Sequence, residues 1–232
     1  MTLTCLTGNL ACQARYARFG VVTDDGAPDH RSPASRRERK KLATRHALSS
    51  AALELATERG LENITIEDIT ARADVALRTF SNYFASKHEA ICAIPADRAR
   101  GIGASLLQRP PGEPLWEALS NAVLEHYEGT DQAFGRESMA RIGLIVQAPA
   151  IRGEYLKIHA EMQEALAAAI ARRTGTDRAA DMYPEILAGS VTAATQVAIM
   201  HWFRADPPQP LRPIIKRALQ QLAAACSPEA GE

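Results

Sequence analysis

The chain lacks the sequence features of several large classes of protein. Its four cysteines, Cys5, Cys12, Cys92 and Cys226, show no C-x-x-C and no paired Cys/His spacing, so we predict neither a disulfide framework nor a metal site. No stretch approaches the roughly 18 consecutive apolar residues of a membrane span. The apolar residues near the N-terminus are too interrupted for a signal peptide. We therefore expect a cytoplasmic protein with no membrane association.

The common catalytic and cofactor motifs are also missing. His159-Ala160-Glu161 gives an H-x-E, but no P-C-x-x-C follows it, which excludes a deaminase zinc site. Gly101-Ile102-Gly103 has no preceding strand and no third glycine, which excludes a dinucleotide-binding loop. Neither G-x-S-x-G nor H-E-x-x-H occurs. We expect no cofactor and no catalytic residues.

Apolar content is high, and charge is unevenly distributed. The chain is 46% hydrophobic, enough for a sizeable core. The formal net charge is zero, but residues 31–88 hold 11 Lys/Arg against 7 Asp/Glu, which gives 11 − 7 = +4. Seven of these cations fall within fifteen positions: Arg31, Arg36, Arg37, Arg39, Lys40, Lys41 and Arg45. Such a run is a solvated helix face or a flexible arm, unless a DNA-binding motif beside it turns it toward phosphates.

Single residues mark several helix ends in the first half of the chain. Gly60 closes a helix that begins near Arg36. Thr65 caps a short helix that begins at Ile66. Ser86 caps a later helix, which Pro95 should kink or split.

The second half of the chain is predicted to be helical throughout, after a linker with the sequence RPPGEP. No alternating strand and no internal repeat is found. The longest helices are expected at about 150–173, about 177–204 and 211–225. The predicted fold class is all-α, with about nine helices.

The most informative stretch is Ala71–Phe84, ARADVALRTFSNYF. It predicts a short helix, a tight break at Asp74 and Val75, and a second short helix. Arg and Asn side chains can form paired hydrogen bonds to base edges, and hydroxyls suit phosphate oxygens. The second helix supplies these groups from Arg78, Thr79, Ser81, Asn82 and Tyr83. This is the chemistry of a helix-turn-helix, whose apolar core we expect to contain Ile66, Ile69, Val75, Leu77, Phe80 and Phe84.

This pattern resembles the DNA-binding domain of the TetR family of bacterial transcriptional regulators. The matching positions are Thr65, Ile69, Ala73-Asp74-Val75-Ala76, Phe80, Tyr83-Phe84 and Lys87. Three residues depart from the family pattern: Asp74 replaces the turn glycine, Ala76 replaces a serine, and Thr70 replaces an alanine. Asp tolerates the turn geometry better than most residues, whereas Ala76 removes a helix cap.

The resemblance implies a division into a disordered arm (residues 1–34), a helix-turn-helix domain (35–85) and a helical effector-binding and dimerisation domain (86–228). The expected DNA contacts are Arg37, Lys41, Thr44, Thr65, Ala76, Leu77, Arg78, Thr79, Ser81, Asn82, Tyr83 and Lys87. Lys87 lies in the first turn of a helix, where the helix dipole disfavours a cation. A DNA phosphate would remove that conflict.

The resemblance also implies a homodimer formed by the last two helices, bound to a near-palindromic duplex operator. A small hydrophobic effector would release this dimer from DNA, most often relieving repression. The expected effector-binding residues are Trp116, Met139, Ile142, Tyr155, His159, Met162, Thr192 and Gln196. Two alternatives stay open. One is a DNA-binding regulator without a small-molecule effector, controlled by abundance or a protein partner. The other is a helical enzyme with a borrowed N-terminal fold.

Overall fold

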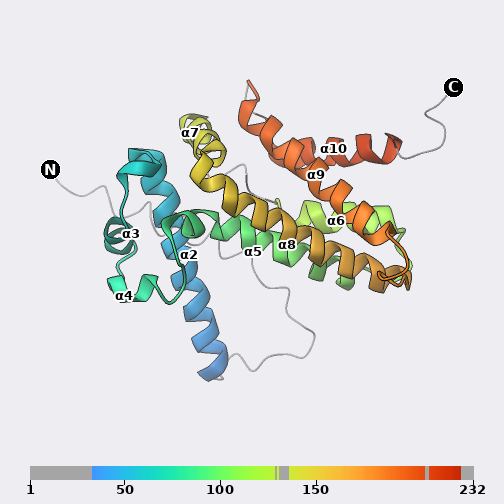
Figure 1. Cartoon of the computed structure of the whole chain (residues 1–232), viewed down its shortest axis with the longest axis horizontal. Helices are drawn as coiled ribbons and strands as arrows, with labels where there is room; N and C mark the ends of the chain where they lie inside the picture. Colours follow the sequence, from blue (N-terminus) through green and yellow to red (C-terminus); the bar gives the residue numbers. More distant parts are fainter. Residues whose placement is uncertain (1–32, 129, 131–135, 207–208, 226–232) are drawn as a thin grey trace. The chain divides into compact units, whose positions relative to one another are not determined.

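The computed structural model describes residues 33–128, 130, 136–206 and 209–225, with side chains from residue 36 and, in the helix after residue 135, from residue 141. Within these ranges the chain forms nine α-helices and one 3-10 helix, with no strand (Figure 1). The all-α prediction is confirmed. The elements are α2 Pro33–Arg59, η1 Leu61–Asn63, α3 Ile66–Arg72, α4 Leu77–Phe80, α5 Lys87–Gln108, α6 Leu115–Glu125, α7 Arg136–Gln147, α8 Pro149–Thr174, α9 Tyr183–Arg204 and α10 Leu211–Ala225.

The chain divides into two compact units, one up to Ile91 and one from Cys92. The boundary therefore lies inside α5, six residues after the expected one. The first turn of α5 therefore belongs to the N-terminal unit. Residues 1–32, most of the predicted disordered arm, lie outside the described residues.

The N-terminal unit has an apolar core formed by α2, η1, α3 and α4. Of the predicted core residues, Ile69, Phe80 and Phe84 are at most 3% exposed. Ile66 and Val75 are half-buried. Leu77 is 50% exposed, so its predicted core position is wrong. The four-residue α4 buries only Phe80, and its first turn lies in solvent. The core is completed by side chains from α2 and η1, chiefly Leu48, Leu55, Leu61 and Ile64.

Most predicted helix ends agree with the structure, because short-range interactions set them. Gly60 ends α2 with φ 86° and Gly175 ends α8 with φ 71°, the left-handed conformations that favour glycine. The backbone N–H of Glu89 donates to Ser86 Oγ at 3.1 Å, as a cap requires. The helix continues through Pro95, so the expected split does not occur.

The start of α9 differs from the prediction by six residues. The Asp177 side chain accepts a hydrogen bond from the Ala179 N–H, and Asp181 accepts one from the Tyr183 N–H. These contacts favour turns over helix. Pro184 then lies in the first turn of α9, where its missing N–H costs nothing.

The C-terminal unit packs α8 against α7 and α9, and α10 against α6 and α9. Its core is aliphatic and includes Leu106, Leu119, Ile151, Leu166, Ile170 and Ile215. Small residues set the helix spacing: a side-chain carbon added at Gly103 on α5 would lie 2.7 Å from the Ala165 carbonyl oxygen on α8.

The segment 109–114, predicted as a linker, is held in place by one arginine. Arg173, near the end of α8, donates to the carbonyl oxygens of Arg109, Pro110 and Glu113. Arg109 also forms two 2.7 Å hydrogen bonds to the Glu113 carboxylate, which lower the pKa of Glu113 to about 2. The segment is therefore a fixed corner between α5 and α6.

Candidate DNA-binding surface and effector region

The turn between α3 and α4 is a left-handed helix end built on Asp74, which has φ 54°. The Asp74 N–H donates to the Ala71 carbonyl at 3.3 Å, and the Val75 N–H donates to the Thr70 carbonyl at 3.0 Å. This pair of bonds is a Schellman motif, which glycine usually closes. Aspartate adopts the left-handed region more readily than most other residues, as expected at this position.

Thr65 fixes the start of α3 through a capping box. Its hydroxyl accepts from the Asp68 N–H at 3.1 Å and donates to Asp68 Oδ2 at 2.8 Å. The Thr65 N–H donates to the same carboxylate at 2.9 Å. These hydrogen bonds hold the pKa of Asp68 below its usual value. The predicted cap is confirmed, and the Thr65 hydroxyl already has two partners within the chain.

Two arginines hold the helix-turn-helix against α2. Arg72 on α3 donates to both carboxylate oxygens of Glu58, at 3.1 and 2.8 Å, and lowers the pKa of Glu58. The Arg45 guanidinium on α2 lies 4.7 Å from the centre of the Phe84 ring, a cation–π distance. The positions of α3 and of the turn after α4 are thus each tied to α2.

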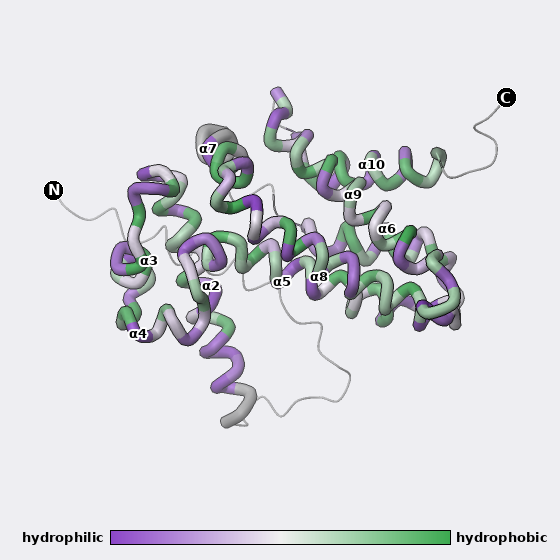
Figure 2. Tube along the Cα trace, in the orientation of Figure 1, coloured by the Kyte–Doolittle hydropathy of each residue, from purple (hydrophilic) through white to green (hydrophobic). Residues whose placement is uncertain are grey.

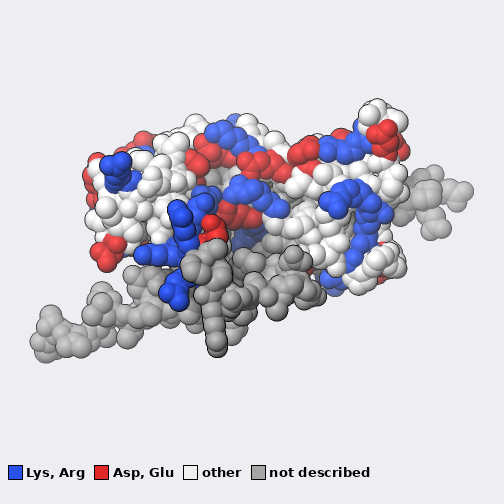
Figure 3. Space-filling view, turned by 90° about the horizontal axis from the view of Figure 1, so that it is seen from below, with Lys and Arg blue, Asp and Glu red and all other residues white. Residues whose placement is uncertain are grey.

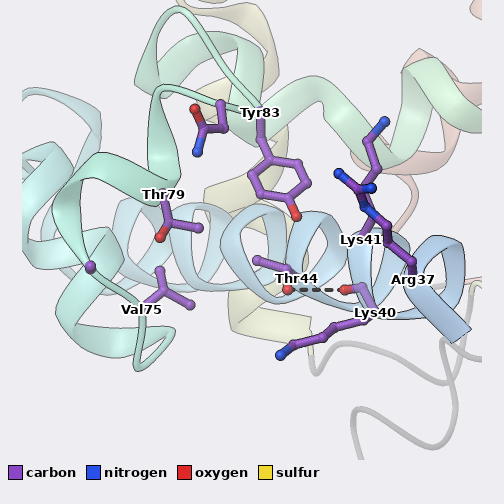
Figure 4. Close-up of a pocket in the computed structure, with 9 residues that line it drawn as sticks. Arg37, Lys40, Lys41, Thr44, Val75, Thr79 and Tyr83 are labelled. Carbon is purple, nitrogen blue, oxygen red and sulfur yellow. Dashed lines mark hydrogen bonds between the residues drawn. The ribbon is translucent and has the colours of Figure 1, made fainter. Parts of the chain in front are cut away.

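An open groove of about 510 Å³ separates α2 from α4 and the turn that follows it. Residues of α2 form one wall, and residues 75–83 form the other. The ring of Tyr83 points into the groove, and the Thr44 hydroxyl donates to the Lys40 carbonyl at 3.0 Å (Figure 4). The lining residues are Arg37, Lys40, Lys41, Thr44, Val75, Ala76, Thr79, Asn82 and Tyr83.

The groove combines cations from one wall with neutral hydrogen-bonding groups from the other. Arg37, Lys40 and Lys41 are exposed, in the hydrophilic first turns of α2 (Figure 2). Lys and Arg side chains gather around this end of α2 (Figure 3). Thr79 and Asn82 face them across the groove. Such a surface suits a polyanion whose bases also present hydrogen-bonding edges.

The structure brings seven of the twelve predicted DNA contacts together in this groove: Arg37, Lys41, Thr44, Ala76, Thr79, Asn82 and Tyr83. The sequence analysis missed Lys40 and Val75. Lys40 could have been found, since it lies three residues after Arg37 and four before Thr44 on one helical face. Leu77, Arg78 and Ser81 are exposed outside the groove.

The second helix is shorter than the sequence predicted. It ends at Phe80, and Ser81, Asn82 and Tyr83 lie in the turn that follows. Its first residue is preceded by Ala76, which makes no side-chain cap. The missing serine therefore leaves the start of α4 uncapped, as expected.

Lys87 has partners that the sequence did not predict. Its ammonium donates to the Leu61 carbonyl at 2.9 Å and to the Ile64 carbonyl at 3.0 Å. These acceptors compensate the unfavourable position of a cation in the first turn of α5. Lys87 thus ties α5 to the segment before α3, and its contact with a DNA phosphate stays a prediction.

The predicted effector residues do not form one buried group. Ile142, Met162 and Thr192 are buried; Trp116, Tyr155 and His159 are half-buried. Gln196 is exposed, because α9 buries Thr192 and Thr195 on another face. The side chain of Met139 lies outside the described part of the chain.

Three of these residues show polar groups in apolar surroundings. The rings of Tyr155 and His159 lie 6.0 Å apart on successive turns of α8. Burial lowers the pKa of His159 and raises that of Tyr155. The Thr192 hydroxyl is buried with no hydrogen-bond partner.

The sequence analysis missed a second polar neighbourhood in the same unit. The Arg98 guanidinium on α5 lies 4.8 Å from the centre of the buried Tyr127 ring. Nearby along α5, Ser105 Oγ lies 2.8 Å from His126 Nε2, and burial lowers the pKa of His126. These groups come from different helices, so no spacing in the sequence signals their approach. In the described ranges no three His, Cys, Asp or Glu side chains are grouped as a metal site would need.

The helix α9 has an apolar exposed face. Ile186 and Val197 are 61% and 67% exposed, and Met182 just before the helix is 74% exposed. Of the described helices, α9 alone is long and apolar enough to cross a membrane by length and composition. Its opposite face packs on α8 and α10, as in the core helix of a folded unit.

Each of the two units matches a known protein family. Residues 48–91 match the model for bacterial regulatory proteins of the tetR family, and residues 113–227 match the MftR C-terminal domain. The chain is 34% identical over 179 residues to the HTH-type transcriptional regulator TcmR of Streptomyces glaucescens. That match covers 73% of this chain and 78% of TcmR.

Solved structures share the fold. A protein from Syntrophomonas wolfei assigned to the TetR family matches with a TM-score of 0.59 and 18% identity, covering 83% of this chain and all of that one. SmeT, solved as a complex with triclosan, matches with a TM-score of 0.55 and 19% identity, covering 79% of this chain and 91% of its own.

Proposed function

Because the chain belongs to the TetR family of bacterial transcriptional regulators, which are DNA-binding proteins and not enzymes, we propose that it is a homodimeric repressor. It binds a near-palindromic operator, and a small, largely apolar effector releases it. Its place of action is the cytoplasm, where the DNA is.

The main support for this proposal is the groove between α2 and α4. Arg37, Lys40 and Lys41 supply three exposed cations on one wall. Lys and Arg contacts to phosphates provide most of the sequence-independent affinity for DNA. Asn82 and Thr79 on the other wall offer hydrogen bonds, of which the Asn amide can pair with adenine.

The operator is tested with DNA fragments from around the gene at stated salt concentrations. Each chain contributes one helix-turn-helix, so a two-fold dimer requires half-sites about 34–36 Å apart, or a multiple of that distance. Footprinting should show two protected half-sites with this spacing. Equal affinity for every fragment would reject a sequence-specific repressor.

The exposed apolar face of α9 supports the dimer. Ile186 and Val197 lie eleven residues apart, three helical turns on one face, and both are largely exposed. Val197→Glu should convert the dimer to a monomer in analytical ultracentrifugation. Leu156→Glu, at a 63% exposed leucine on α8, is the matched control and should leave the dimer intact. A dimer that survives Val197→Glu and Ile186→Glu together would contradict this interface.

Effector release is tested by filling the C-terminal unit. Buried Ile142 and Met162 suit an apolar ligand, and SmeT is a protein of this fold solved with triclosan. Ile142→Trp should abolish the response to the inducing compound while operator binding persists. If these residues only pack a solid core, the change should instead destabilise the fold by about 1–3 kcal/mol. That result would favour control by abundance or by a protein partner.

A further inference from the structure

The helix α4 has a second outward face besides the one that lines the groove. Its helical backbone continues through Ser81, which has φ −64° and ψ −16°. With 3.6 residues per turn, Leu77, Arg78 and Ser81 fall within one arc of about 100° around the helix axis. Thr79 lies on the other side of the helix, toward the groove. Leu77, Arg78 and Ser81 are all exposed, and together they form what we call the outer face of α4.

Leu77 is the apolar member of the outer face. Its side chain is 50% exposed, whereas that of Phe80 on the same helix is 1% exposed. A single exposed leucine needs no explanation on most protein surfaces. Leu77 differs from such a residue in its position, because it is the first residue of the second helix of a helix-turn-helix. In that motif the N-terminal residues of the second helix contact base edges in the major groove of DNA.

The chemistry of leucine limits what Leu77 can recognise on a base. Its side chain has no hydrogen-bond donor or acceptor, whereas the nitrogen and oxygen atoms of base edges are recognised through hydrogen bonds. The apolar group that a base presents in the major groove is the C5 methyl of thymine. Contact between this methyl and Leu77 removes apolar surface of both groups from water, which is favourable.

We propose that Leu77 is a specificity-determining residue, which selects a thymine in each half-site of the operator by packing on its C5 methyl group. This assignment rests on the proposed function, and it specifies one base of the DNA that the protein binds. Arg78 and Ser81 flank Leu77 on the outer face, and their side chains suit hydrogen bonds to neighbouring base edges or phosphates. The contribution of Leu77 depends on the methyl group alone.

Replacement of thymine by deoxyuridine tests this contact, because it removes the methyl group and keeps the base pair. Each thymine in one half-site of the footprinted operator is replaced in turn, and fluorescence anisotropy measures the affinity of the full-length protein for each duplex. At one position the replacement should weaken binding about three- to fourfold, as the loss of one buried methyl predicts. Leu77→Ala should bind the thymine and deoxyuridine duplexes equally.

Two control variants identify the side chain that contacts the methyl. Thr79→Ser removes a methyl from the groove side of α4 and keeps the hydroxyl, so it should retain the three- to fourfold discrimination. Leu42→Ala alters a leucine on α2 that is 41% exposed, and it should retain the discrimination as well. Discrimination that persists in Leu77→Ala, or that disappears in Thr79→Ser, would overturn the assignment to Leu77.

The stability of the Leu77 variants is checked by thermal melting. Leu77→Ala should melt close to the unmodified protein, because half of the leucine side chain is already in water. If Leu77→Ala does not fold or does not bind, Leu77→Met and Leu77→Gln decide at low salt, where phosphate contacts strengthen binding. These two side chains have similar lengths, so the apolar Met should keep the discrimination and the polar Gln should lose it. Equal discrimination by the two variants would overturn the proposal.

Footprinting separates this proposal from the proposed function. Two protected half-sites in which no thymine is sensitive to the replacement would overturn the role of Leu77 and leave the repressor proposal intact. If the protein protects no half-site on any fragment, both proposals fail.

Discussion

The two units of this protein differ in what fixes their structure. In the N-terminal unit, the start of α3 and the turn after it are fixed by partners close in sequence: Thr65 with Asp68, and Asp74 through its own backbone. Arg72 and Lys87 add hydrogen bonds to residues farther along the chain. In the C-terminal unit, the decisive contacts join distant helices, as when Gly103 meets Ala165 or Arg98 meets Tyr127.

This difference matches two kinds of task. A DNA-binding surface must hold its side chains at fixed positions before the ligand arrives, and local motifs provide that stiffness. The C-terminal unit instead contains a buried hydroxyl, that of Thr192, with no hydrogen-bond partner among the described residues. The comparison predicts that the two units respond to different kinds of substitution.

The largest effect should come from overfilling the helix contact of the C-terminal unit. In Gly103→Ala the new carbon would lie 2.7 Å from a main-chain oxygen, so α5 and α8 must separate. We expect a loss of about 3 kcal/mol in the free energy of unfolding, the upper end of the overpacking range. Gly153→Ala on α8 is the control, since nothing lies within 4 Å, and it should stabilise by about 0.5–1 kcal/mol. Urea denaturation measures the free energy of unfolding of both variants. Equal changes would contradict the close contact between Gly103 and Ala165.

The next effect concerns the two walls of the groove. Asn82→Ala should weaken binding to the operator by about 2 kcal/mol and hardly change binding to random DNA, if its amide contacts a base. Arg78→Ala tests the exposed arginine of α4 in the same way. Lys40→Ala should weaken binding to all sequences and reduce the slope of log affinity against log salt by about one. Fluorescence anisotropy at several salt concentrations separates these cases. Identical losses on both kinds of DNA would refute the division of roles.

A smaller effect tests the capping box. Thr65→Ala should lower the free energy of unfolding by about 1 kcal/mol at pH 7. Thr65→Ser keeps the hydroxyl and should change the free energy of unfolding little. The pKa of Asp68 is lowered by its hydrogen bonds from Thr65. Its stabilising contribution is therefore complete above the unfolded pKa, about 4, and is lost as the pH falls through the folded value. In thermal melts, the difference between Thr65→Ala and the parent should accordingly narrow at low pH without vanishing, because the hydrogen bond from the Asp68 N–H to the Thr65 hydroxyl does not titrate. A constant difference across that range would contradict the linkage.

The smallest expected effect is a gain. The left-handed conformation of Asp74 costs an ordinary residue about 1–2 kcal/mol, and glycine loses about 0.4–1 kcal/mol through its unfolded-state freedom. Asp74→Gly should therefore stabilise the N-terminal unit by about 0.5 kcal/mol. Asp74→Ala should destabilise it. Hydrogen exchange of the α3 amides measures this local stability. A lower stability in Asp74→Gly would mean that the aspartate side chain itself stabilises the turn.

The same contrast decides how much the sequence could predict. The ends of α2, α3 and α8 were predictable because Gly60, Thr65 and Gly175 act within one helical turn. The start of α9 was not, because two aspartates and Pro184 compete with a helical pattern that extends across them.

The candidate sites follow the same rule. Seven groove residues could be predicted, since the groove joins one helical face of α2 to the segment with the family pattern. The contacts of Lys87 with the Leu61 and Ile64 carbonyls span more than twenty residues, and no local signal marks them. The exposure of Gln196 depends on which face of α9 the other helices cover.

The hydrogen bonds that Arg173 donates to the segment 109–114 have a consequence for proteolysis. A segment with three prolines and a glycine between two helices would ordinarily be the first place for a protease to cut. Here Arg173 holds three of its main-chain carbonyls, so the backbone resists entry into a protease active site, which requires an extended strand. Limited digestion should therefore leave residues 109–114 intact, and Arg173→Ala should create a new cleavage site there.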